Sequence, residues 1–132
     1  MVVGDAAGQC KPVSGGGIYT GAVAAKIAAA VAAEAVFEND FSEQKMSVYE
    51  KRWKKELGRE LEIGMAAHAY RMKLSDSEMN DIFETLHDPE ILDMITEYGD
   101  MDHPSVLIRK LMFSKHSLKM MKLAGTLFKN FF

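Results

Sequence analysis

Apolar residues recur at helical spacing along most of this chain, which predicts a mainly α-helical protein. The alanine-rich stretch from Gly17 to Phe37 has the composition of a long helix, because alanine is the best helix former. Asn39 and Asp40 predict a break after it. The predicted buried stripe of this helix follows a period near 3.6 residues and comprises Ile18, Val23, Ile27, Val31 and Ala35.

A second helix is predicted from Met46 to Met72. Its charged residues lie on one face, as expected of an amphipathic helix with one solvent-exposed side. Gly58 and Gly64 weaken it unless something packs closely against them. The apolar ladder on its other face comprises Tyr49, Trp53, Leu57, Leu61, Gly64 and His68, and we interpret it as core.

The rest of the chain predicts short helices whose ends can be read from capping residues. Ser75 and Glu78 form a capping box that opens a helix to about Leu86. Asp88-Pro89 opens the next helix, and Gly99 fits the C′ position that ends it. Two further helices are predicted, one opened by Asp102 or His103 with Pro104 and running to about Phe113, and one covering Ser117 to Phe128.

An N-terminal preface precedes the long helix. Met1–Val3 reads as a short β-strand, and residues 4–17 form a glycine-rich loop containing Pro12. The predicted fold class is therefore mainly α. A short N-terminal strand and Gly-rich loop lead into a long helix and a C-terminal helical bundle. Residues 1–40 form one predicted part and residues 41–132 the other.

Composition narrows the possible functions. The formal net charge of −3 gives no support to nucleic-acid binding. The single cysteine, Cys10, excludes an internal disulfide framework, and is either a reactive thiol near a cofactor or a small buried residue. The scattered histidines lack zinc-site spacing, so we predict no metal site. No secretory signal peptide is visible, and Lys26 and Glu34 favour a packed soluble helix over a membrane span for the alanine-rich stretch.

Charge is unevenly distributed, since residues 104–132 contain no Asp or Glu. The segment is either a basic surface that meets an anionic partner or a solvated helix face. Its end interleaves lysines with apolar residues and could lie at a membrane interface through residues 115–132 or pack against another domain. The lysines there are Lys115, Lys119, Lys122 and Lys129, and the apolar residues are Leu118, Met121, Leu123, Leu127, Phe128, Phe131 and Phe132.

The preface carries the candidate chemistry. Asp5 follows the predicted strand, and its carboxylate can accept hydrogen bonds from ligand hydroxyls. The helix N-terminus near Gly17 offers backbone N–H groups and a partial positive charge, which favour phosphate or a ring that gains negative charge. A plain glycine-rich turn with Asp5 as a helix cap explains the short Gly4–Gly8 segment nearly as well.

The longer string Val3-Gly4-Asp5-Ala6-Ala7-Gly8-Gln9-Cys10-Lys11-Pro12-Val13-Ser14-Gly15-Gly16-Gly17-Ile18-Tyr19 resembles the second FAD-binding motif of the geranylgeranyl reductase family, flavoproteins of the p-hydroxybenzoate hydroxylase superfamily. Looser similarity to archaeal members continues in the family's order, so the resemblance covers most of the chain. The later segments are Tyr49-Glu50-Lys51-Arg52-Trp53 with Leu57-Gly58, then Leu74-Ser75-Asp76, and Gly99-Asp100-Met101-Asp102-His103-Pro104-Ser105.

The resemblance implies a set of cofactor-binding residues. Asp5 is expected to contact the ribityl chain of FAD, and Gly17 with Ile18 to lie against the isoalloxazine ring. Pro12 and Gly15 are expected to shape the loop beside the ring, and Gly4 and Gly16 complete the predicted set. The helix N-terminus would stabilise the anion of reduced flavin. No catalytic residue or proton donor is nominated.

The resemblance also implies that the FAD site is only half present. The family begins with a Rossmann unit bearing G-x-G-x-x-G, and this sequence has no such fingerprint. We therefore expect a fragment of a larger α+β flavoprotein, which needs a missing N-terminal FAD domain as partner and is doubtful as a catalyst alone.

The implied activity is reduction of geranylgeranyl double bonds on a prenylated glycerophospholipid in archaeal membrane-lipid synthesis. The implied location is the cytoplasm, with peripheral contact at the inner face of the cell membrane. A non-catalytic helical interaction module and a fragment of a related FAD monooxygenase stay open as alternatives.

Overall fold

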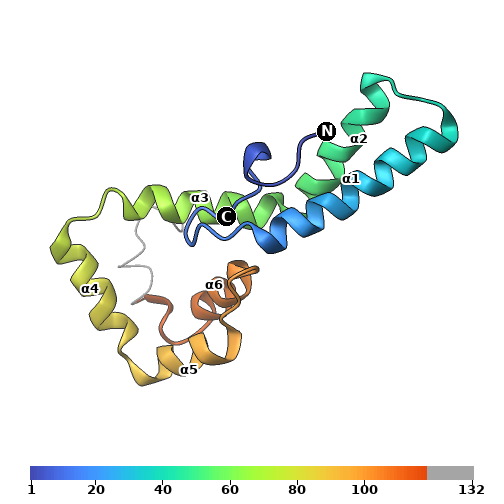
Figure 1. The fold of residues 1–132 in the computed structure, drawn as a ribbon. Helices are drawn as coiled ribbons and strands as arrows, with labels where there is room; N and C mark the ends of the chain where they lie inside the picture. Colours follow the sequence, from blue (N-terminus) through green and yellow to red (C-terminus); the bar gives the residue numbers. More distant parts are fainter. Residues whose placement is uncertain (119–132) are drawn as a thin grey trace. The chain divides into compact units, whose positions relative to one another are not determined.

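The computed structural model describes residues 1–118, and these residues confirm the mainly α fold class (Figure 1). No strand is assigned within this range, so the predicted strand at Met1–Val3 is not formed. A β-strand is stabilised by ladder hydrogen bonds to a neighbour, and the described part of the chain offers no second strand. The chain divides into two compact units, Met1–Glu62 and Ile63–Phe132. The predicted division into residues 1–40 and 41–132 stays a prediction.

The long helix α1 spans Ile18–Glu38, within one residue of the predicted bounds. It ends at Asn39, whose φ of 50° is left-handed and whose N–H bonds to the carbonyls of Ala35 and Val36. The N–H of Asp40 also reaches the Ala35 carbonyl, at 3.0 Å. The predicted break at these two residues is confirmed, because together they satisfy the last carbonyls of the helix.

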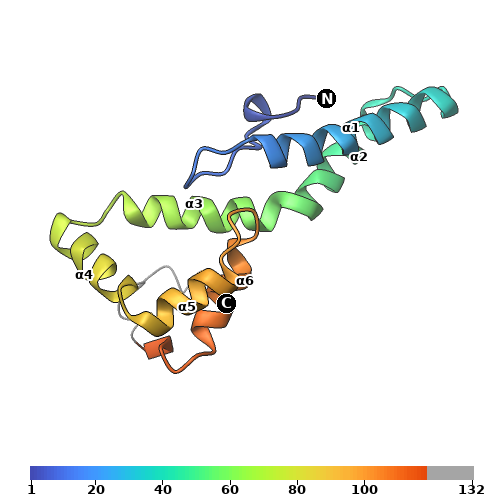
Figure 2. The ribbon, with the colours of Figure 1, turned by 60° about the horizontal axis from the view of Figure 1, so that its bottom comes forward.

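Helix α2, Glu43–Trp53, turns back and lies beside α1 in both ribbon views (Figures 1 and 2). Its N-cap Ser42 accepts a hydrogen bond from the Lys45 N–H at 3.2 Å. Charged side chains also link the two helices: Lys45 pairs with Glu38 at 2.9 Å, and Arg52 pairs with Glu34. Small residues on α1 allow the close approach.

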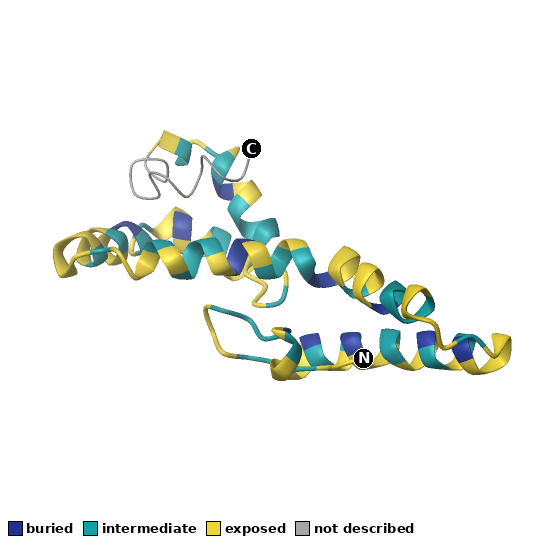
Figure 3. Cartoon of the chain, turned by 90° about the horizontal axis from the view of Figure 1, so that it is seen from above, coloured by how far each residue is buried: buried dark blue, intermediate teal, exposed yellow. Residues whose placement is uncertain are grey.

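The predicted buried stripe of α1 is only partly confirmed. Val31 and Ala35 are fully buried, whereas Ile18 is 92% exposed and Val23 and Ile27 are half-buried. The buried face comprises Thr20, Ala24, Val31 and Ala35. Because α2 and the N-terminal loop cover one side of α1, the buried face is set by those neighbours rather than by the largest apolar residues. Figure 3 shows buried positions along α1 separated by exposed ones.

The second predicted helix is a continuous helical run with a change of pitch. A π-helical turn, Lys54–Gly58, joins α2 to α3, which spans Arg59–Arg71. Leu57 within this turn is buried, as predicted. A Cβ on Gly58 would meet the Lys54 Cβ at 3.6 Å, an ordinary contact, so close packing does not explain this glycine.

The second unit contains α4, Asp76–Leu86, α5, Pro89–Tyr98, and α6, Pro104–Met112. The capping box of Ser75 with Glu78 and the N-cap role of Asp88 before Pro89 are confirmed. Helix α5 packs against both α4 and α6 (Figure 2). Ile91 on α5 and Leu111 on α6 are buried. Of the last predicted helix, residues 119–128 lie outside the described residues.

Two predicted caps differ in detail. Gly99 ends α5 at the C-cap, one residue before the predicted C′ position, and its φ of −71° is not left-handed. Glycine is nevertheless needed, because a Cβ at Gly99 would overlap the carbonyl oxygen of Ile95. Of the two candidates for the α6 cap, His103 occupies the N-cap position, without a side-chain cap hydrogen bond.

Among the described helices, α1 is long and apolar enough to cross a membrane by length and composition. A single such helix is weak evidence for a membrane span, since core helices of soluble proteins pass the same test.

Candidate functional site

The glycine-rich loop begins with a tight turn. Residues Asp5–Ala7 form one 3₁₀ turn between Gly4, at φ 80°, and Gly8, at φ 69°. The Gly4 carbonyl accepts the N–H of Ala7 at 2.9 Å and that of Gln9 at 3.2 Å. Because L-residues rarely adopt such φ values, both glycines are required by the turn itself. The Gly4 N–H donates to Gln9 Oε1, so Gly4 serves the turn, and its predicted role in cofactor binding stays a prediction.

A second turn closes the loop before α1. The Lys11 N–H bonds to the Gly16 carbonyl at 3.0 Å, and the Gly15 N–H bonds to the Lys11 carbonyl at 2.9 Å. Gly15 is left-handed at φ 71°, and Pro12 lies in the turn with its φ fixed by its ring. A Cβ on Gly16 would lie 2.9 Å from the Lys11 Cε, so the lysine side chain lies against this glycine.

Asp5 and Gly17, two predicted site residues twelve positions apart, are brought together. A Cβ on Gly17 would lie only 2.5 Å from Asp5 Oδ1, so the carboxylate lies directly beside the start of α1. Gly17 is the N-cap of α1 and makes no side-chain cap hydrogen bond. The carboxylate thus lies near the positive end of the helix dipole. Ile18 follows with its side chain 92% exposed.

The structure also shows an anchor that sequence reasoning missed. Gln9 is fully buried, and its Oε1 accepts the Gly4 N–H at 2.8 Å while its Nε2 donates to the Tyr49 hydroxyl at 2.8 Å. The Tyr49 hydroxyl donates onward to the Val2 carbonyl at 2.8 Å. Thr20 of α1 donates its hydroxyl hydrogen to the Gln9 carbonyl at 2.5 Å. The five-residue network therefore ties the loop to both α1 and α2.

The Tyr49–Trp53 segment, which resembles the family, holds α2 against α1. Arg52, in the Tyr49–Trp53 segment, makes a two-pronged ion pair with Glu34, at 2.6 and 3.0 Å. The pKa of Glu34 is lowered, chiefly by the hydrogen bond from Arg52.

Cys10 is half-buried and its thiol forms no disulfide. Its role as a reactive thiol near a cofactor or as a small buried residue stays a prediction.

The segment Gly99–Ser105 is organised by Asp100. Its carboxylate accepts the backbone N–H of Asp102 at 2.7 Å and of His103 at 3.2 Å, and also contacts the His103 ring at 3.0 Å. The pKa of Asp100 is lowered, first by the hydrogen bond from the Asp102 backbone. Asp100 thus holds the connection between α5 and α6.

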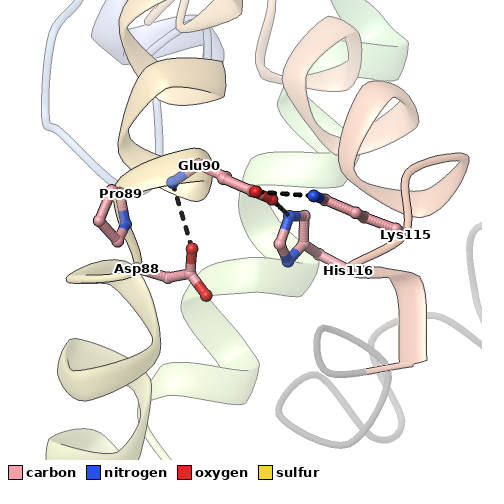
Figure 4. Close-up of a pocket in the computed structure, with 5 residues that line it drawn as sticks. All are labelled: Asp88, Pro89, Glu90, Lys115 and His116. Atoms are coloured by element: carbon pink, nitrogen blue, oxygen red, sulfur yellow. Dashed lines mark hydrogen bonds and ion pairs between the residues drawn. The ribbon is translucent and has the colours of Figure 1, made fainter.

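A second cluster of polar groups lies at the N-terminus of α5 (Figure 4). The Glu90 carboxylate pairs with Lys115 Nζ at 2.6 Å and with His116 Nε2 at 2.7 Å. The pKa of Glu90 is lowered, first by Lys115 and then by His116.

Asp88, Glu90 and His116 place potential ligand atoms within 4.8 Å of one another. However, the Glu90 carboxylate is already paired through one oxygen with Lys115 and through the other with His116, and the N-terminus of α5 disfavours a bound metal cation. The cluster is therefore an ion-pair network that fastens the residues after α6 to α5.

Sequence comparison assigns the chain to a family. It is 35% identical to digeranylgeranylglycerophospholipid reductase 2 of Methanopyrus kandleri over 90% of this chain and 31% of that protein. It is 42% identical to digeranylgeranylglycerophospholipid reductase 1 of Methanothermobacter thermautotrophicus over 68% of this chain and 23% of that protein. An uncharacterised protein of Methanocaldococcus jannaschii is 36% identical over 86% of this chain and 29% of its own length.

The chain is therefore a relative of the archaeal proteins named as digeranylgeranylglycerophospholipid reductases. Within them, it corresponds to the C-terminal part of the digeranylgeranylglycerophospholipid reductases, which confirms the predicted resemblance. The chain spans between 23% and 31% of the length of these three relatives. No family model and no solved structure matches it.

Proposed function

We propose that this chain supplies the C-terminal part of an FAD-dependent reductase that saturates geranylgeranyl double bonds on a glycerophospholipid precursor. The supporting observation is the contact of Asp5 with Gly17, which places a carboxylate beside an N-terminal helix end without a side-chain cap. The family matches supply the substrate class, since several relatives are named as reductases of that lipid.

The residues present fit one half of a flavin site. Asp5 is exposed, so its carboxylate can accept hydrogen bonds from the ribityl hydroxyls. The backbone N–H groups at the start of α1 can stabilise negative charge on the ring, and Gly17 lets that backbone approach a flat ligand. FAD, when bound, supplies the hydride for alkene reduction.

The other half of the site requires a partner, which we propose to be the N-terminal part of the family. Helix α1 exposes large apolar side chains along its length, with Ile18 and Phe37 each 92% exposed and Val36 68% exposed. Exposed apolar surface of this extent is typical of a protein interface. The chain spans only part of the length of its relatives, which supports the rest of such a protein as the proposed partner.

The test is complementation. The chain is co-expressed with the N-terminal part of the Methanothermobacter reductase, and the purified complex is examined for flavin absorbance and for reduction of digeranylgeranylglycerophospholipid. We expect yellow protein that reduces the lipid, and colourless complex with an Asp5→Ala variant. A colourless wild-type complex would support a non-catalytic interaction module. Reduced-cofactor oxidation with oxygen uptake and no alkene reduction would instead identify a monooxygenase.

We further propose a cytoplasmic location with peripheral membrane contact, as a lipid substrate requires. The predicted contact segment, residues 115–132, lies mostly outside the described residues, and Lys115 within it is paired with Glu90. Sedimentation of the complex with anionic and with neutral vesicles tests this contact. Equal recovery in the supernatant with both would contradict it.

A further inference from the structure

We infer that Gln9 and Tyr49 are positioning residues for the flavin half-site, acting on it through Asp5 and the start of α1. This inference rests on the proposed function. Neither residue belongs to the predicted cofactor-binding set, and Tyr49 lies forty positions away in sequence from Gln9.

Gln9 connects to both sides of the Asp5–Gly17 contact. On the Asp5 side, its Oε1 holds the Gly4 N–H and its own N–H reaches the Gly4 carbonyl, which fixes the turn that carries Asp5. On the Gly17 side, its carbonyl accepts from Thr20 in the first turn of α1. Gln9 therefore sets the distance between the Asp5 carboxylate and the N-terminus of α1.

Tyr49 holds Gln9 in that position. Its hydroxyl accepts from Gln9 Nε2 and donates to the Val2 carbonyl, so it spans the loop and the chain start from α2. Both side chains are buried, with Gln9 at 0% and Tyr49 at 5% exposure. A phenylalanine would fill the same space, so packing alone does not account for a hydroxyl with two partners.

A purely structural role is the competing explanation. In that case loss of the Tyr49 hydroxyl lowers stability, while the flavin site of the folded protein is unchanged. A positioning role has a different signature, because the carboxylate and the helix N-terminus lose their fixed separation in protein that is still folded.

The matched variants are Tyr49→Phe and, as control, Tyr98→Phe, which removes a tyrosine hydroxyl in the second compact unit. In the complemented complex we expect Tyr49→Phe to raise the dissociation constant of FAD about tenfold, the effect of losing one buried hydrogen bond. The same variant of the chain alone is expected to speed amide exchange at Gly4 and Gln9 about tenfold. Tyr98→Phe is expected to change neither.

A double-mutant cycle identifies the route. If Tyr49 acts through Asp5, Tyr49→Phe has much less effect on FAD affinity when Asp5 is already asparagine. Full additivity of the two substitutions would overturn the inference, as would an unchanged dissociation constant for Tyr49→Phe. Those results leave the proposed function intact, whereas absence of FAD from the wild-type complex overturns both.

Discussion

Gly17→Ala tests whether the contact between Asp5 and the start of α1 forms the flavin half-site. Gly17 has φ −120°, which alanine adopts without strain, so the backbone itself tolerates the change. The new Cβ would lie 2.5 Å from Asp5 Oδ1, and the carboxylate must retreat by roughly an ångström to reach normal contact distance.

The expected stability change is small because opposing effects nearly cancel. Moving the exposed Asp5 side chain off its rotamer costs about 0.5–1.5 kcal/mol. Replacing glycine by alanine at a compatible φ gains about 0.4–1 kcal/mol by restricting the unfolded chain. The net change in the free energy of unfolding is therefore expected to stay within about 1 kcal/mol.

Flavin affinity is expected to respond far more strongly. Hydrogen bonds to a charged group contribute about 1.5–3 kcal/mol, so displacing the carboxylate should weaken FAD binding by roughly 10- to 150-fold. The assay is titration of the complemented complex with FAD, read by flavin fluorescence, beside thermal unfolding of each variant. Gly58→Ala is the control, because its Cβ would meet Lys54 at an ordinary 3.6 Å. Unchanged FAD affinity in Gly17→Ala would refute the placement of the flavin beside Asp5.

Two further predictions concern the second unit. Gly99→Ala is expected to lower the free energy of unfolding by about 1–3 kcal/mol, because the added Cβ overlaps the Ile95 carbonyl oxygen; an unchanged melting temperature would contradict this. The lowered pKa of Glu90 means that its ion pairs stabilise the fold above the unfolded-state value near 4.5 and are lost as pH falls through the folded-state pKa. The protection factors of the Lys115 and His116 amides, which are exchange rates corrected for the intrinsic pH dependence, should fall across that acid range in the wild type and stay flat in Glu90→Gln. Identical profiles would exclude the Glu90 network as the cause.

Local features of the fold were predictable because their causes lie within a few residues. The capping box at Ser75 and the Asp88-Pro89 helix start require only neighbours in sequence, and both are confirmed. The break after α1 is local in the same way. The prediction of a strand at Met1–Val3 was wrong for the opposite reason, since a strand forms only beside a second strand elsewhere in the chain.

In the candidate site too, the features with local causes were predictable and those that depend on distant residues were not. The positive φ angles of Gly4 and Gly15 follow from local turn chemistry. The Gln9–Tyr49 hydrogen bond joins residues forty positions apart. The sequence pattern placed Tyr49 among the apolar core residues of the second helix and gave no sign of a role for its hydroxyl. A polar glutamine beside the glycine turn was the available signal, but its burial depends on α2, which sequence spacing does not place.

The exposed face of α1 bears on what covers this chain in its assembled state. Only 22% of the most apolar window of α1 is buried, so most of this apolar helix is open to a partner such as the one proposed above. A bilayer is a poor cover, because Glu34, about one turn before the end of α1, is ion-paired with Lys45 and Arg52 of α2. Inserting α1 would carry these charges into hydrocarbon or break their pairs, either of which is costly. A protein surface is the better cover, since it can pack on Ile18 and Phe37 and still leave the ion pairs of Glu34 with Lys45 and Arg52 intact.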